Sequence, residues 1–200
     1  MVTNSIIDSR GIGFYQIFTL FLLSRAFVNY KLNLEFIILG FHYKILKHVV
    51  LDMLEMANQL SEDGKYSYAL KYYKNILQID STNIQAIIDY GVTLQNLELY
   101  HQALLVYDRA LKLQPKNTIA LINKGSVLHT LEKYTNAITC YDAALRIYGN
   151  NPTALVYKGL CIAEMGNIQL AIKYFKKALS IDSQCELAKV SIDTAKYIVK

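Results

Sequence analysis

The stretch that decides the fold is residues 84–117, IQAIIDYGVTLQNLELYHQALLVYDRALKLQPKN. Its small and aromatic residues recur along the chain at an interval of 34 residues. That interval relates three glycines, four alanines and four aromatic residues: Gly91, Gly125, Gly159; Ala69, Ala103, Ala137, Ala171; Tyr73, Tyr107, Tyr141, Phe175. A self-similar unit of this length predicts helical hairpins that stack in series.

This unit resembles the tetratricopeptide repeat. Residues 84–117 carry the large, small and aromatic residues of that family in the expected order: Ile87, Gly91, Leu94, Tyr100, Ala103, Tyr107, Ala110, Pro115. The resemblance covers four units, at residues 50–83, 84–117, 118–151 and 152–185. It implies an all-α, right-handed superhelical solenoid. The first unit departs most, because Ile76 replaces a small residue and Ser81 replaces a proline.

Apolar residues three and four apart predict two helices in each unit. In units two to four the first helix is expected from about Ile84, Thr118 and Pro152. The second helix is expected after turns at residues 98–99, 132–133 and 166–167. Pro152 suits the first helical position, and an asparagine before it can cap the helix. Residues 186–200 are predicted to form one more helix that caps the array.

Residues 1–49 do not continue the repeat and form an apolar N-terminal extension. Their charge-free run at residues 11–24 ends at Arg25 after 14 residues, whereas a membrane-spanning helix needs about 18 or more. Three interpretations stay open. The extension caps the array or plugs its groove, or residues 12–43 contact a membrane surface, or the start of the chain is mis-assigned and lies near Met53.

Composition and charge favour a folded helical chain. Hydrophobic residues make up 53% of it, and it has only 2 prolines. The net charge is +5, of which residues 1–49 carry 5 minus 2, or +3, so residues 50–200 carry +2. An array this close to neutral, without a basic stripe, predicts no nucleic-acid partner. The unpaired cysteines indicate a reducing compartment, so a cytoplasmic location is expected, with membrane association as the alternative.

The resemblance places a partner-binding groove on the first helix of each unit. The residues expected to line it are Leu54, Asn58, Ile88, Val92, Gln95, Ile122, Ser126, His129, Val156 and Leu160. Aliphatic residues at one repeated position predict an apolar floor beside a polar rim, which suits an extended peptide or an amphipathic helix. The cations with which some members of the family hold a chaperone's carboxylate are absent.

The titratable residues show no pattern typical of catalysis. Cys140, Cys161 and Cys185 lie in separate units without a CxxC pair, so neither a zinc site nor a redox motif is implied. The repeated tyrosines are predicted to pack in the core, and Asp108 and Asp142 to lie on a solvated helix face. We therefore predict a non-enzymatic interaction scaffold without catalytic residue, cofactor or metal. Its partner is a protein or peptide, with self-association as an alternative.

Overall fold

The computed structural model describes residues 31, 39–40 and 42–198. The chain divides into two compact units, Met1–Val49 and Val50–Lys200. The described residues of the first unit are all helical. The apolar run at residues 11–24, on which the membrane interpretation depends, lies outside the described residues. In the part of the chain that is described, no helix is both long and apolar enough to cross a bilayer.

The second unit is a series of helices joined by short turns. Residues 50–62 form its first helix. The others are α2 (Tyr66–Ile79), α3 (Ile84–Asn96), α4 (Tyr100–Leu113), α5 (Thr118–Thr130), α6 (Tyr134–Ile147), α7 (Pro152–Glu164), α8 (Ile168–Ile181) and α9 (Glu186–Ile198). Residues 42–198 contain no strand. The all-α prediction is confirmed, as are the predicted starts of α3, α5 and α7.

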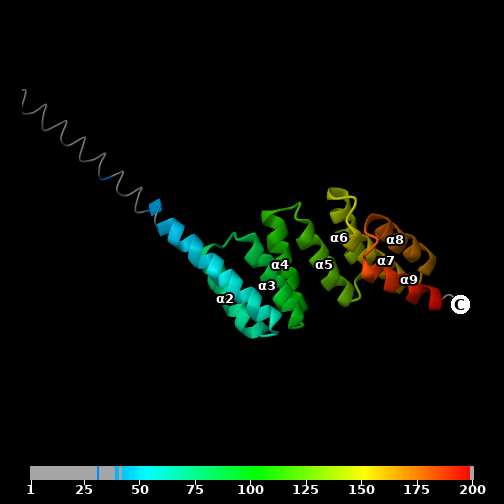
Figure 1. Cartoon of the computed structure of the whole chain (residues 1–200), viewed down its shortest axis with the longest axis horizontal. Coiled ribbons are helices and arrows are strands. Elements are labelled where there is room, and N and C mark those ends of the chain that lie inside the picture. Colours follow the sequence, from blue (N-terminus) through cyan, green and yellow to red (C-terminus); the bar gives the residue numbers. More distant parts are fainter. Residues whose placement is uncertain (1–30, 32–38, 41, 199–200) are drawn as a thin grey trace, which may run out of the picture. The chain divides into compact units, whose positions relative to one another are not determined.

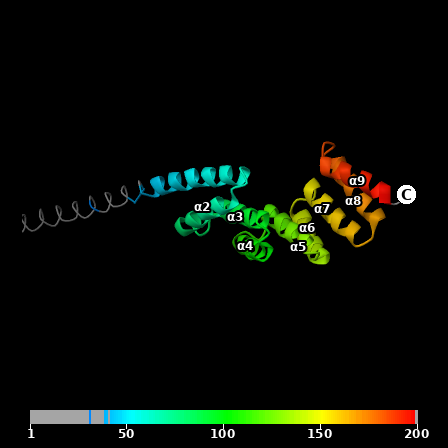
Figure 2. The ribbon, with the colours of Figure 1, turned by 90° about the horizontal axis from the view of Figure 1, so that it is seen from below.

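Each helix of this unit packs on the next one along the chain (Figures 1 and 2). Contacts between alternate helices occur on one side only. Helix α3 contacts α5, α5 contacts α7, and α7 contacts α9, whereas α2, α4, α6 and α8 do not contact one another. The unit is therefore a helical solenoid in which α3, α5 and α7 share one face.

Asparagines set the start of the three helices that share this face. The Oδ1 atom of Asn83 accepts a hydrogen bond from Ala86 N at 3.0 Å. Asn117 and Asn151 make the same contact with Ala120 and Ala154, both at 2.9 Å. Each contact satisfies an amide of the first turn that has no partner within the helix. The predicted cap before Pro152 is confirmed, and it is one of a repeated series.

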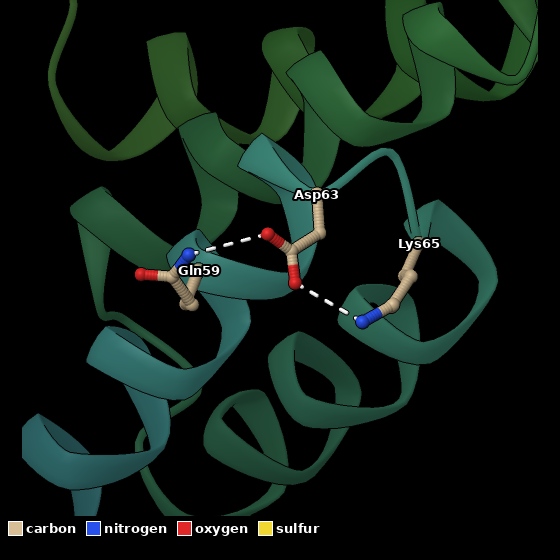
Figure 3. Close-up of polar contacts among 3 residues, drawn as sticks. All are labelled: Gln59, Asp63 and Lys65. Atoms are coloured by element: carbon tan, nitrogen blue, oxygen red, sulfur yellow. Dashed lines mark hydrogen bonds and ion pairs between the residues drawn. The ribbon is translucent and has the colours of Figure 1, made fainter.

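The turn inside each hairpin needs a left-handed residue. Glycine supplies it at Gly64 (φ 73°) and Gly166 (φ 87°), while Glu98 and Glu132 adopt φ of 59° and 58° in the two central units. Figure 3 shows the first of these turns. Asp63 accepts hydrogen bonds from Gln59 Nε2 at 3.3 Å and from Lys65 Nζ at 3.1 Å. Because these side chains are exposed, their ion pair adds little stability.

The core forms where an aromatic ring lies against a glycine. Tyr107 and Tyr141 are fully buried. A Cβ atom placed on Gly91 would lie 2.6 Å from Cε1 of Tyr107, and one on Gly125 would lie 2.6 Å from Cε1 of Tyr141. The ring occupies the space that a larger side chain would need, which is why the small residue recurs. The prediction that the repeated tyrosines pack in the core is confirmed.

Candidate functional site

The structure places the predicted groove residues at very different depths. Ile88 is only 5% exposed, and Val156 is not exposed at all. Ile88 packs with Ile87, Ala110 and Ala120 in the core between α3 and its neighbours. The predicted floor formed by these two residues is therefore wrong. Repeat spacing located them on the right helices, but close packing of successive helices covers them.

Two further aliphatic residues of the predicted floor are half-buried. Leu54 packs against the core cluster that contains Tyr73. Ile122 lies between the clusters that contain Tyr141 and Leu121. Both side chains contribute mainly to packing between helices. The apolar surface that remains open on this face is smaller than the sequence predicts.

The remaining six predicted residues keep access to solvent. Asn58 and Val92 are exposed, and Gln95, Ser126, His129 and Leu160 are half-buried. Gln95 Nε2 donates to Ser126 Oγ at 3.3 Å, so a hydrogen bond connects α3 with α5 across this face. The surface shared by α3, α5 and α7 is thus largely polar, with Val92 and Leu160 as apolar points.

A hollow of about 250 Å³ opens at one end of this face. We call the packing of α3 on residues 50–62 and α2 the first junction, that of α5 on α4 the second, and that of α7 on α6 the third. The hollow lies at the first junction and is lined by Asn58, Ser61, Glu62, Tyr73, Gln85, Asp89, Val92 and Thr93. Asn58 and Val92 are the only members of this lining that the sequence analysis placed in the groove.

Hydrogen bonds fix the walls of the hollow. Tyr73 Oη donates to Asn58 Oδ1 at 2.7 Å. The Thr93 hydroxyl donates to the backbone oxygen of Asp89 at 2.8 Å and lies 3.4 Å from the hydroxyl of Ser61. Tyr73 and Thr93 are each 1% exposed. The lining is therefore a preformed, rigid surface in which the polar groups of three helices converge.

Asp89 is the half-buried charge of this hollow. Gln85 Nε2 donates to both of its carboxylate oxygens, at 3.0 and 2.9 Å. Burial raises the pKa of the Asp89 carboxyl, and the hydrogen bonds from Gln85 oppose that shift only in part. Within the described residues, no lysine or arginine forms an ion pair with Asp89.

The other two junctions do carry such ion pairs. Lys124 Nζ lies 2.6 Å from Asp108 Oδ1 at the second junction, and Lys158 Nζ lies 2.5 Å from Asp142 Oδ1 at the third. Burial works against the charge of Lys158, but the hydrogen bond to Asp142 outweighs it and the pKa of Lys158 is raised. The prediction that Asp108 and Asp142 lie on a solvated face is wrong, because each of them binds the next helix.

The equivalents of Asp89 explain why the hollow occurs only once in this series. Asn123 and Tyr157 stand 34 and 68 residues further along. Tyr157 stacks on Tyr141, with ring centroids 5.9 Å apart and planes inclined by 15°. A ring therefore stands at the third junction where the first has a short carboxylate.

Histidine and cysteine contribute no reactive group to this face. The His129 ring lies 5.5 Å from that of Tyr134. Burial raises the pKa of Cys161 to about 12 and also raises that of Cys140, so both thiols stay protonated near neutral pH. In the described ranges, no three histidine, cysteine, aspartate or glutamate side chains gather as a metal site would require.

A helical solenoid with a polar face and a lined hollow defines a class of proteins that bind other proteins through a repeat array. Sequence models described as tetratricopeptide repeat match residues 84–117 and 117–184. The chain belongs to the tetratricopeptide repeat family, and its fold is that of a protein-interaction scaffold. Proteins built from this repeat are generally not enzymes.

Solved structures agree with this assignment. The repeat protein TTC0263 of Thermus thermophilus is 17% identical, with a TM-score of 0.68 over 75% of this chain and 82% of that one. PilF of Pseudomonas aeruginosa is 19% identical, with a TM-score of 0.69 over 76% and 70%. YrrB is 24% identical, with a TM-score of 0.57 over 73% and 75%. At these identities the likeness shows the fold alone. No curated protein matches the chain.

Proposed function

We propose that this protein captures a peptide or an amphipathic helix of a partner protein on the face shared by residues 50–62, α3, α5 and α7. One observation carries the proposal. Asn58, Val92, Ser126 and Leu160 stand 34 residues apart, and all four keep access to solvent on successive helices. A row of accessible side chains on closely packed helices suits a ligand that runs across them.

A structural relative supports a peptide as the ligand. The structure of YrrB is described as that of a tetratricopeptide repeat protein with an unusual peptide-binding site. The face described here differs from the apolar groove that the sequence predicts, because Ile88 and Val156 are buried. Recognition would depend on polar contacts from Asn58, Gln95 and Ser126, and on apolar contact with Val92. We also propose that α9 caps the array at its C-terminal end.

The test is selection of peptides by the full chain, followed by blocking of the face. Random dodecapeptides displayed on phage are panned against the protein, and the affinities of the selected peptides are measured. Val92→Lys adds a long charged side chain at a position that is 37% exposed. Affinity should fall at least about tenfold, the change expected for removal of an important interface contact.

Leu105→Lys is the matched control. Leu105 is 71% exposed on α4, a helix outside the proposed face. It should leave the affinity of the selected peptides unchanged. Equal losses with both variants, or no peptide selected at all, would contradict the proposal. Ile88→Lys is a poor test, because it would bury a charge and unfold the junction.

Membrane contact is the second candidate, and a specific observation favours it. Leu39, Tyr43 and Ile45 are 63%, 71% and 59% exposed in the first unit. Large apolar side chains exposed on a helix suit a membrane surface. The full chain should then co-sediment with vesicles, and a variant with serine at all three positions should not. Self-association would appear instead as a mass that rises with concentration in sedimentation, with and without vesicles.

A further inference from the structure

The hollow at the first junction exists because of one side chain. Asp89 stands where Asn123 and Tyr157 stand at the next two junctions. Tyr157 places a ring on Tyr141, whereas the short carboxylate of Asp89 leaves space beside Tyr73. The same backbone positions therefore produce a filled junction at one place and an open, lined hollow at another. Its walls are fixed, because Tyr73 and Thr93 are buried and hydrogen-bonded.

The hollow has the charge of an acceptor site. Two of its eight lining residues, Glu62 and Asp89, are acidic, and none is basic. The neighbouring carboxylates of Asp108 and Asp142 are each neutralised by a lysine of the next helix. Asp89 has only the neutral amide of Gln85, although it is half-buried. A partly desolvated carboxylate without a cation gains free energy when a cation comes within contact distance.

We propose that this hollow receives the side chain of a lysine or arginine from a basic segment of a partner protein. The inference rests on the proposed function, since the cation would belong to the captured peptide. Asp89 would bind the charged end, and the oxygen atoms of Asn58 and Ser61 lie on the same lining as further acceptors. Glu62, which is exposed, would attract the segment to the site. Val92 would contact the methylene groups of the side chain.

The chain itself supplies variants for the test. Asp89→Asn removes the charge and introduces the residue that stands at 123. Asp89→Tyr fills the space with the residue that stands at 157. Both replacements occur naturally at equivalent positions of the same fold, so both are expected to fold, which circular dichroism verifies. Asp108→Asn is the control, because it removes a carboxylate that already binds Lys124.

The first measurement is the phage selection described above, repeated on each variant. Peptides selected by the native chain should be enriched in lysine or arginine at one position. Their affinity for Asp89→Asn and for Asp89→Tyr should fall about tenfold or more, as expected for loss of a charge-assisted contact. Asp108→Asn should bind them unchanged. Selected peptides without basic enrichment, and with equal affinity for all variants, would overturn this inference and leave the proposed function standing.

A second measurement does not depend on finding a peptide. N-acetyl-lysine amide is titrated into the isotopically labelled full chain, with N-acetyl-norleucine amide as the uncharged control. The side-chain amide signals of Asn58 and Gln85, which line the hollow, should shift with the lysine compound only, and this shift should disappear in Asp89→Asn. Equal shifts with both compounds, or none with either, would count against a cation site. A shift that survives in Asp89→Asn would place the cation elsewhere.

Discussion

The first and third junctions of this solenoid use the same positions for opposite purposes. At the third junction, Tyr157 stacks on Tyr141, and Lys158 binds Asp142 and lies 4.7 Å over the ring of Tyr174. At the first junction, Asp89 faces an open hollow and has no lysine or arginine among its described neighbours. The third junction is filled and neutralised by its own side chains, whereas the first leaves space and charge for another molecule.

The difference shows how a repeat array divides its work. The glycine and the buried aromatic ring are common to the second, third and fourth units, since they hold each hairpin together. The residue that faces the preceding unit is free to vary, because it lies at the edge of the contact. Asp89, Asn123 and Tyr157 are three choices at that one place. One substitution at this position therefore decides whether a junction stabilises the protein or offers a surface.

The largest expected effect separates the two junctions by the ring beneath them. Tyr141→Ala should lower the free energy of unfolding by about 3–5 kcal/mol, because it leaves a cavity in a fully packed core. Tyr73→Ala should cost about 1 kcal/mol less, since no aromatic ring stacks on it where Asp89 stands. Urea unfolding of both variants measures the difference. Equal costs would mean that the third junction is not the better packed one.

A second substitution should convert the third junction into a copy of the first. Tyr157→Asp removes the stacked ring and brings a carboxylate beside Tyr141. We expect a loss of about 2 kcal/mol, from the lost aromatic contact and the partly desolvated charge. Thermal unfolding measures it, with Asp89→Tyr as the converse variant, which should be neutral or stabilising. If Tyr157→Asp were as stable as the native chain, the stacked ring would contribute nothing to cohesion.

A smaller effect distinguishes the tyrosine hydroxyls. Tyr73→Phe removes the 2.7 Å hydrogen bond to Asn58 and should cost about 1 kcal/mol. Tyr141→Phe should cost nothing or stabilise the fold, because the buried Tyr141 hydroxyl has no hydrogen-bond partner. The fourth unit already has Phe175 at this position. Chemical denaturation of the two variants side by side is sufficient, and a larger loss for Tyr141→Phe would reverse the assignment.

The smallest effect concerns the charge of Asp89. Burial raises its pKa above 3.8, the usual value. The folded state therefore holds this proton more tightly than the unfolded state, and stability falls as pH rises through the interval between the two pKa values. Asp89→Asn should be more stable than the native chain at pH 7, by less than about 1 kcal/mol. The advantage should disappear below pH 3.8. Thermal unfolding across that range tests it, and a constant advantage would exclude the charge as its cause.

Much of the fold could be predicted from the sequence. Glycines, alanines and aromatics at a 34-residue interval predicted the hairpins, and the helices α3, α5 and α7 begin where their spacing indicated. The candidate site could be predicted only in part. The spacing placed Ile88 and Val156 on the correct helices but could not tell that the neighbouring helices cover them. The ion pairs of Lys124 and Lys158 were also missed, because they join residues 16 apart on different helices.

The sequence by itself determined the repeat, the helices, the caps and the family, because these depend on local spacing and on the small residues that helix contact requires. Only the tertiary structure decided which face is open and where it is hollow. That outcome depends on side-chain volume and charge across junctions, where Asp89, Asn123 and Tyr157 look equally acceptable as letters in a repeat. Packing makes them different, since a ring fills the third junction and a carboxylate leaves the first one open.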